Sequence, residues 1–333
     1  MRDLADLAGV SPATVSRALN GRDEVSRATR EAVVRMARRH GYSANRSAQA
    51  LAAGRTGLVG VTVPMVHHSY FAVILAGITE ALHEHDLRAV LCPTHHEHDR
   101  EVSLLERLIG GTTDGALLVL PEESEDELSA LGRHGYHFVV VDPLRRLDER
   151  IPAVSAAHSA GAAEATRLLL DLGHRRIGVV TGPPTWLATE ERLQGHRAAL
   201  VTTGAVADPA LEEKAGFDIE SGAAAASRLL ACRRPPTAIF AFNDPMAIGT
   251  LQAARAAGLR VPEDLSVVGF DDTPEASIVS PTLTTVRQPL AEMGRMAVNL
   301  LARLLRREPF EALHIELATK LVVRGSTAPP RRP

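Results

Sequence analysis

The sequence predicts a small all-α head at the N-terminus, followed by a larger α/β body built of parallel sheets. Residues 3–21 repeat apolar side chains at helical spacing in two short blocks separated by a glycine. From Thr56 onward, short apolar runs alternate with stretches of helical pattern. Repeated strand and helix units of this kind form parallel sheets covered by helices.

The first two predicted helices form a helix-turn-helix. Gly9 can end the first helix, Ser11 can cap the second, and Pro12 suits its first position, where no N–H is needed. The predicted buried side chains are Leu4, Leu7 and Ala8 in the first helix and Val15, Ala18 and Leu19 in the second. The residues left outward or at the rim are Ser11, Pro12, Ala13, Thr14, Ser16, Arg17 and Asn20. Small and hydroxyl side chains followed by an arginine suit base edges and phosphates in a major groove, although any surface helix pair is the alternative.

A third helix is predicted from a Ser26 cap to Gly41, which closes a small core. Residues 1–55 contain ten arginines, no lysine and five acidic residues, so this segment carries +5. The whole chain carries −3, so the remainder carries −8. A basic head on an acidic body is the charge distribution expected of a DNA-binding protein.

The body has seven predicted strands and six predicted helices. The strands are 57–63, 87–91, 115–120, 137–142, 176–181, 237–241 and 266–271. The helices are 71–85, 100–109, 159–172, 189–204, 219–232 and 245–257. About 280 residues are long for one doubly wound sheet and suit two.

Composition excludes several classes of protein. No run of eighteen apolar residues exists, and Met1 is followed by a polar amphipathic helix instead of a signal peptide, so we expect a cytoplasmic, nucleoid-associated protein without a membrane partner. Cys92 and Cys232 are then expected to be buried, reduced thiols. An enzyme is disfavoured, because the chain has no Walker A loop, no G-x-G-x-x-G after a strand and no G-x-S-x-G elbow. A secreted solute-binding protein is disfavoured by the basic helix-turn-helix.

A metal site is the remaining alternative, because seven of the fourteen histidines fall between positions 67 and 98. They are His67, His68, His83, His85, His95, His96 and His98. Zinc needs three or four ligands with ordered spacing, whereas these lie on three separate stretches. We therefore expect no metal and no cofactor, and solvated loop or lobe-edge positions for these residues. His67 and His68 follow the first strand, where ligands approach open α/β sheets.

Several motifs resemble the lactose-repressor (LacI/GalR) family of bacterial transcription regulators. They are D-L-A-x-L-A-G-V-S-x-A-T-V-S-R-A-L-N-G from Asp3, V-S-x-x-T-R-E-A-V from Val25, G-Y-S-A-N from Gly41, F-N-D-P-M-A-I-G from Phe242, V-P-E-D-L-S-V-V-G-F-D-D from Val261 and S-P-T-L-T-T-V-R-Q-P from Ser280. The resemblance covers nearly the whole chain and implies a two-lobed body like the periplasmic sugar-binding proteins, with three crossing strands and a ligand between the lobes.

The resemblance also implies a domain organisation. The helix-turn-helix domain would span 1–43, a hinge helix or linker 44–56, the two-lobed body 57–327 and a disordered tail 328–333. Lobe one would comprise about 57–156 and 287–320, and lobe two about 157–286 and 321–327. In the hinge, Leu51 would enter the minor groove as an apolar wedge beside Ala48, with Asn45 and Arg46 near phosphates. The alternative for the hinge is a weakly helical linker.

The family's effector-binding positions are matched here by residues on both lobes. The polar set that the resemblance implies is Asp142, Arg192, Asn243, Asp271 and Gln288. Further implied contacts are Ser69, Tyr70, Phe71 and Phe217. We add Trp186, the only tryptophan, because it lies in a loop after the strand at 176–181, at the edge of the sheet where ligands sit. Asp244 and Asp272 are expected to cap helices and not to touch ligand.

Three positions depart from the family pattern. Pro143 follows Asp142 where an arginine is usual, and Ala157-His158 replaces a common Asp-Asn helix cap. Met1 also stands too close to helix one to allow the usual Thr or Ser cap, so we expect a start a few codons upstream or weak DNA binding. The expected function is a homodimeric repressor that binds palindromic operator DNA and is controlled by a small-molecule effector, most simply a carbohydrate stacking on Trp186.

Overall fold

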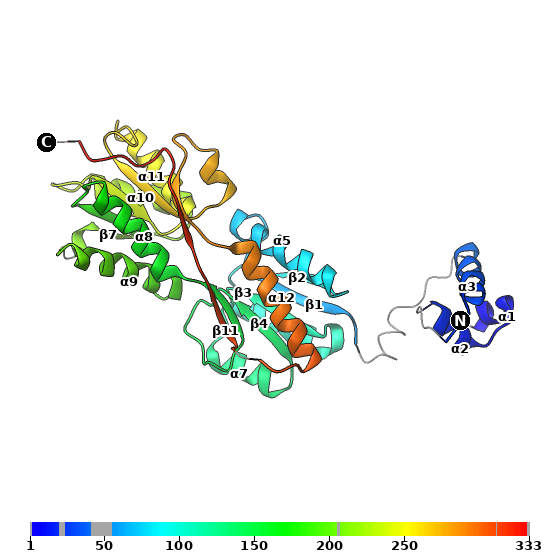
Figure 1. The fold of residues 1–333 in the computed structure, drawn as a ribbon. Helices are drawn as coiled ribbons and strands as arrows, with labels where there is room; N and C mark the ends of the chain where they lie inside the picture. Colours follow the sequence, from blue (N-terminus) through cyan, green and yellow to red (C-terminus); the bar gives the residue numbers. More distant parts are fainter. Residues whose placement is uncertain (1, 20–23, 41–54, 205–206, 311, 332–333) are drawn as a thin grey trace. The chain divides into compact units, whose positions relative to one another are not determined.

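The computed structural model describes residues 2–19, 24–40, 55–204, 207–310 and 312–331 (Figure 1). It divides into two compact units, Met1–Gly57 and Leu58–Pro333. Each unit is described by itself. None of the described helices is long and apolar enough to cross a membrane.

The first unit is a three-helix head of α1 (Arg2–Ala8), α2 (Pro12–Leu19) and α3 (Arg27–Arg39). The caps are those predicted: the backbone N–H of Thr14 donates to Ser11 Oγ at 3.1 Å, and that of Thr29 donates to Ser26 Oγ at 3.2 Å. The core consists of Leu4, Ala5, Val15, Ala18, Val25, Val33 and Ala37.

The prediction that Leu7 belongs to the head's core is wrong, because this residue is 50% exposed. Ala5 is buried instead. The first helix has only seven residues, so the face that meets the other helices is one narrow stripe, and Leu4, Ala5 and the partly buried Ala8 fill it.

The second unit contains two sheets, which define two lobes. Lobe one is built on the strand order β11-β5-β4-β3-β1-β2, and every pairing in it is parallel. Its strands are β1 (Leu58–Val63), β2 (Arg88–Pro93), β3 (Gly115–Val119), β4 (His137–Val141), β5 (Ala153–Ala156) and β11 (His314–Leu317). Its helices are α5 (Ser69–Glu84), α6 (His98–Arg107), the π-helical turn η1 (Leu108–Thr112), α7 (Glu125–Arg133) and α12 (Leu290–Arg306).

Lobe two is built on the order β12-β10-β9-β8-β6-β7, which is parallel except for the pairing of β10 with β12. Its strands are β6 (Ile177–Thr181), β7 (Glu212–Lys214), β8 (Ala238–Ala241), β9 (Ser266–Asp271), β10 (Thr284–Arg287) and β12 (Lys320–Val322). Its helices are α8 (His158–Asp171), α9 (Leu187–Thr202), η2 (Pro209–Leu211), α10 (Ile219–Leu230), α11 (Asp244–Ala256) and η3 (Pro274–Ser277).

The predicted α/β architecture is confirmed. Each of the seven strands and six helices expected from the pattern matches an observed element, with ends shifted by no more than two residues. The chain crosses between the sheets three times, after β5, after β10 and after β11 (Figure 1). Since α12 follows β10 but packs on α5 and β4, the C-terminal segment belongs to both lobes.

The C-terminal segment and one cysteine differ from expectation. A disordered tail was expected from residue 328, but the Ser266 hydroxyl donates to the Ala328 carbonyl at 2.9 Å, and Arg331 pairs with Asp264 at 2.6 Å. The described part of the tail is therefore held against lobe two. Both thiols are free, and Cys92 is buried, but Cys232 is partly exposed.

Candidate functional site

The candidate site is a cavity of about 250 Å³ at the carboxyl ends of the strands, lined by both lobes. Parallel strands present their following loops at this edge, which is where ligands bind in open α/β sheets. Lobe one contributes Met65, His67, His68, Tyr70, Phe71, His96, Leu120, Asp142, Pro143 and Leu144. Lobe two contributes Trp186, Ala188, Arg192, Gly216, Phe217, Asp218, Asn243 and Asp271.

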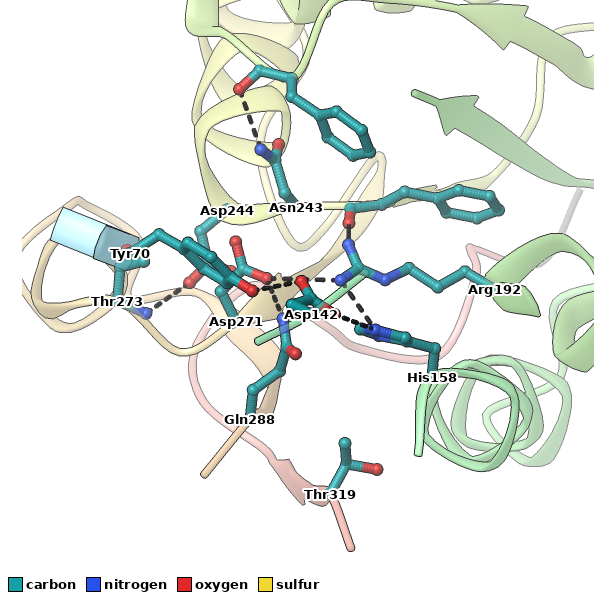
Figure 2. A network of polar contacts seen from close by, with 12 residues as sticks. Tyr70, Asp142, His158, Arg192, Asn243, Asp244, Asp271, Thr273, Gln288 and Thr319 are labelled. Atoms are coloured by element: carbon teal, nitrogen blue, oxygen red, sulfur yellow. Dashed lines mark hydrogen bonds and ion pairs between the residues drawn. The ribbon is translucent and has the colours of Figure 1, made fainter. Parts of the chain in front are cut away.

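A buried polar network crosses from one lobe to the other at this cavity (Figure 2). Asp142 follows β4, and its carboxylate accepts hydrogen bonds from the Tyr70 hydroxyl and from His158 Nε2, the latter at 2.9 Å. His158 begins α8, and its Nδ1 lies 3.2 Å from Arg192 Nη2. An arginine nitrogen can only donate, so Nδ1 must accept and Nε2 carries the proton given to Asp142. His158 therefore links the acid of lobe one to the arginine of lobe two.

Arg192 projects from α9 and has partners on several sides. Its Nη1 donates to the Phe242 carbonyl, and Nη2 lies 3.8 Å from Asp271 Oδ1. Its guanidinium carbon lies 4.0 Å from the centre of the Phe270 ring. Its Nε is buried and has no partner among the described residues.

The two acids of the network are in different electrostatic environments. Burial alone would raise the pKa of Asp142, but the interactions with His158 and the Tyr70 hydroxyl outweigh it and hold that pKa below its usual range. Burial raises the pKa of Asp271 to about 7, against the opposing influence of Arg192 and a hydrogen bond from Gln288. Burial and the neighbouring Asp142 raise the pKa of Tyr70 well above its usual value, so its hydroxyl remains a donor.

The helix cap expected of Asp244 is provided by its neighbour Asn243. Asn243 is the N-cap of α11: its Oδ1 accepts from the Met246 N–H, and its Nδ2 donates to the Phe217 carbonyl, both at 2.9 Å. Asp244, expected to cap, instead accepts from the Thr273 N–H at 2.7 Å and from the Thr285 hydroxyl at 2.5 Å. Burial and the nearby Asp271 raise its pKa well above the usual value.

The prediction that Asp272 caps a helix is also wrong. Its carboxylate binds Arg287 and Arg324, each at 2.6 Å. These arginines lie in and after two strands that come together only in the folded sheet, so no local pattern could reveal the pairing.

Two predicted contacts lie beside the cavity and do not line it. The Ser69 hydroxyl, at the start of α5, donates to the Glu275 carboxylate, which joins lobe one to η3 of lobe two. Gln288 Nε2 donates to Asp271 Oδ1 at 2.7 Å, so Gln288 orients the carboxylate of Asp271 without lining the cavity.

Aromatic side chains line another part of the cavity. The Trp186 ring lies 5.0 Å from Phe217 and 5.7 Å from His96, centre to centre. Tyr70 and Phe71 meet edge to face at 5.2 Å. Phe217, Asp142 and Asp271 have φ values of +66°, +54° and +118°. Backbone in this region is unfavourable for non-glycine residues and is concentrated at functional sites.

The sequence reasoning missed several members of this site, and two of them are histidines that contact predicted residues. In the sequence, His158 stands out only as a departure from the family's helix cap, and His96 only as one of seven clustered histidines, yet both contact predicted site residues. The position of His158 could have indicated this role, because His158 begins α8, directly after the carboxyl end of β5, and this edge of the sheet lines the cavity. Within the described ranges, no three histidine, cysteine, aspartate or glutamate side chains converge as metal ligands.

The head offers the second candidate surface. Pro12 and Ala13 are exposed at the start of α2, and Thr14 is half-buried, with its hydroxyl 2.9 Å from Ser11 Oγ. Arg17 is half-exposed and pairs with Glu24 at 3.0 Å. The side chain of Ser16, and all of Asn20, Asn45, Arg46, Ala48 and Leu51, lie outside the described residues.

A helix-turn-helix head joined to a two-lobed α/β body with a cleft is the architecture of a DNA-binding regulator. Residues 1–45 match the model of bacterial regulatory proteins of the lacI family, and residues 166–327 match a periplasmic binding protein-like domain. The chain is 38% identical to the transcriptional regulator CelR of Thermobifida fusca, over 97% of this chain and 96% of that one. It is 34% identical to the regulator DegA of Bacillus subtilis, over 98% and 97%.

Solved structures agree with these matches. A structure of CelR with cellobiose superposes with a TM-score of 0.77 at 36% identity, over 97% of this chain and 98% of that one. The lac repressor dimer bound to operator and the anti-inducer ONPF gives a TM-score of 0.88 at 28% identity, over 98% of each. The protein belongs to the lacI family and is a DNA-binding transcriptional regulator, not an enzyme.

Proposed function

We propose that this protein is a homodimeric repressor whose affinity for operator DNA is set by a sugar or short glycoside bound in the cleft between its lobes. The observation that carries the proposal is the composition of the cavity. It combines an aromatic wall at Trp186 and Phe217 with hydrogen-bonding groups at Asp142, Arg192 and Asp271. A pyranose has apolar C–H faces and a rim of hydroxyls, and such a cavity complements both.

The polar groups of the cleft already bind one another, and a ligand would use what remains. Arg192 Nε–H is a buried donor without a partner in the described structure, and a buried donor of this kind costs free energy until it is satisfied. A ligand hydroxyl that displaces the groups covering this N–H would recover that cost. Relatives support the class of ligand: CelR was solved with cellobiose, and a regulator from Enterococcus faecium with bound ribose.

The link to DNA is lobe closure. A ligand that binds the two lobes together favours one relative angle, by as much as its affinities for the two states differ. We take lobe one as 57–156 with 287–320 and lobe two as 157–286 with 321–327, so a ligand in the cleft contacts both lobes. The hinge at 44–56 then carries the signal to the DNA-binding domain at 1–43, with Leu51 as a minor-groove wedge.

The DNA partner is a palindrome read by two heads. Ser11, Pro12, Ala13, Thr14, Ser16, Arg17 and Asn20 would approach bases and phosphates in each half-site. A two-fold dimer places half-sites about 10 bp apart. The solved lac repressor dimer on its operator is the corresponding assembly. A regulator of this kind acts in the cytoplasm, on the nucleoid.

The experiment uses an operator selected by the full-length protein from a pool of random duplexes. Fluorescence anisotropy then measures its affinity with and without cellobiose, ribose and other sugars. The proposal expects a palindromic selected site and a sugar that changes the affinity, with Arg192→Ala binding the site normally but no longer responding. A selected site without two-fold symmetry, or an affinity that no sugar alters, contradicts it.

A further inference from the structure

His96 lies in the loop between β2 and α6 of lobe one, and its side chain lines the cavity. Its ring centre lies 5.7 Å from that of Trp186, with the ring planes tilted by 37°. Trp186 precedes α9 on lobe two, so this pair is an aromatic contact between the lobes. Direct aromatic pairs have centres about 4.5–7 Å apart, so the imidazole and indole are in contact.

This contact leaves no room for a ligand ring on that side of the indole. A ring placed between two others needs two stacking distances, at least about 7 Å in total. The imidazole therefore stands where a ligand ring stacking on Trp186 would lie.

Phe217, the other aromatic neighbour of Trp186, cannot move away from the indole as easily. A Cβ on Gly182 would lie 2.1 Å from the Phe217 ring, so that ring is packed directly against the backbone of lobe two. The Phe217 carbonyl also accepts the Asn243 side chain. Phe217 is thus fixed within its own lobe, whereas His96 is on the opposite lobe and moves away if the cleft opens.

His96 is held in place at some conformational cost. His95 and His96 have φ values of +61° and +58°, consecutive left-handed residues without glycine. The loop is anchored by the His95 N–H, which donates to the Pro64 carbonyl at 2.9 Å. Glu122 Oε1 lies 3.1 Å from His96 Nδ1 and orients the ring. An unfavourable backbone maintained by specific partners indicates a role for the side chain that it presents.

We propose that His96 is a specificity-determining residue that occupies the effector's place on Trp186 in the ligand-free protein. The effector must replace the imidazole, so only compounds with a flat ring face, such as pyranoses and their glycosides, compete well, and open-chain polyols do not. Replacement also removes an interlobe contact, which links recognition to the lobe angle. This inference rests on the proposed carbohydrate effector.

The first test needs no effector. Trp186 is the only tryptophan, so acrylamide quenching of intrinsic fluorescence reports its exposure alone. His96→Ala should raise the quenching constant of the ligand-free protein about twofold, because one of two aromatic neighbours is removed. His95→Ala, on the same loop but exposed, should leave it unchanged, and His96→Phe should restore it. Equal quenching in wild type and His96→Ala overturns the inference.

The second test uses cellobiose and ribose as probes, with sorbitol as the open-chain comparison. Calorimetry should show that His96→Ala binds the recognised sugar about threefold to tenfold more tightly than wild type, the range that one aromatic pair contributes. His96→Phe should return towards wild type. Equal or weaker binding by His96→Ala overturns the inference while leaving a sugar effector intact. If neither sugar binds any variant, the choice of sugar class fails, and the quenching result alone decides whether His96 occupies the indole.

Discussion

Asp142 and His158 meet at 2.9 Å on opposite sides of the boundary between the lobes. Asp142 directly follows β4 of lobe one, and His158 begins α8 of lobe two. Through the second imidazole nitrogen the same contact reaches Arg192. The cleft is therefore joined by polar contacts as well as by the chain crossings.

Arg192→Ala should abolish the effector response and leave operator binding intact. Arg192 is buried within the cleft, with 4% of its side chain exposed, and binds His158, Phe242 and Asp271. Its loss removes a charge-assisted donor, and such bonds contribute about 1.5–3 kcal/mol, so effector affinity should fall at least about tenfold. Calorimetry measures it, with operator anisotropy as the control. An unchanged effector dissociation constant would show that this residue does not bind ligand.

Leu51→Ala should weaken operator binding much more than binding to random duplex. The substitution removes the apolar wedge proposed for the hinge and leaves the phosphate contacts, which act on any sequence. Anisotropy titrations at one salt concentration measure both affinities. Equal losses on the two duplexes would rule out intercalation.

Glu123→Gln should change how stability depends on pH. Burial, followed by the neighbouring Glu101, raises the pKa of Glu123 to about 8. The folded state therefore holds a proton that the unfolded chain releases near its ordinary pKa of about 4.3, so this group's contribution to stability is complete below that pH and is lost as pH rises through about 8. The variant keeps a neutral side chain at every pH.

Thermal unfolding from pH 5 to pH 9 tests this. Glu123→Gln should gain stability relative to wild type as pH rises. Glu125→Gln, at an exposed position two residues away, is the matched control and should follow wild type. A constant difference between Glu123→Gln and wild type over this range would contradict the assignment.

Gly77→Ala should destabilise lobe one. A Cβ there would lie 1.9 Å from the Ala291 carbonyl oxygen, because α5 and α12 cross in close contact. Forcing helices apart costs about 1–3 kcal/mol. Gly132→Ala is the control, since a Cβ in α7 at that position meets only the Phe138 ring at 4.0 Å, and alanine favours a helix. Urea unfolding should give opposite signs for the two variants, and similar midpoints would show that the helix crossing tolerates a methyl group.

The sequence by itself determined the elements and their class. Strand and helix periods, the Ser11 and Ser26 caps and the arginine-rich head are local properties, and they predict local structure because neighbouring residues produce them. The motifs of the lacI family also identified Asp142, Arg192 and Asp271 as cleft residues, and all three line the cavity.

Only the tertiary structure decided which of these residues interact with one another. His158 joins Asp142 to Arg192, Asn243 caps α11 while Asp244 is buried beside Thr285, and His96 crosses the cleft to Trp186. Each pair is brought together by the chain's crossings between two sheets. A polar side chain in low dielectric must find a partner wherever the fold supplies one, and no local pattern records which partner that is.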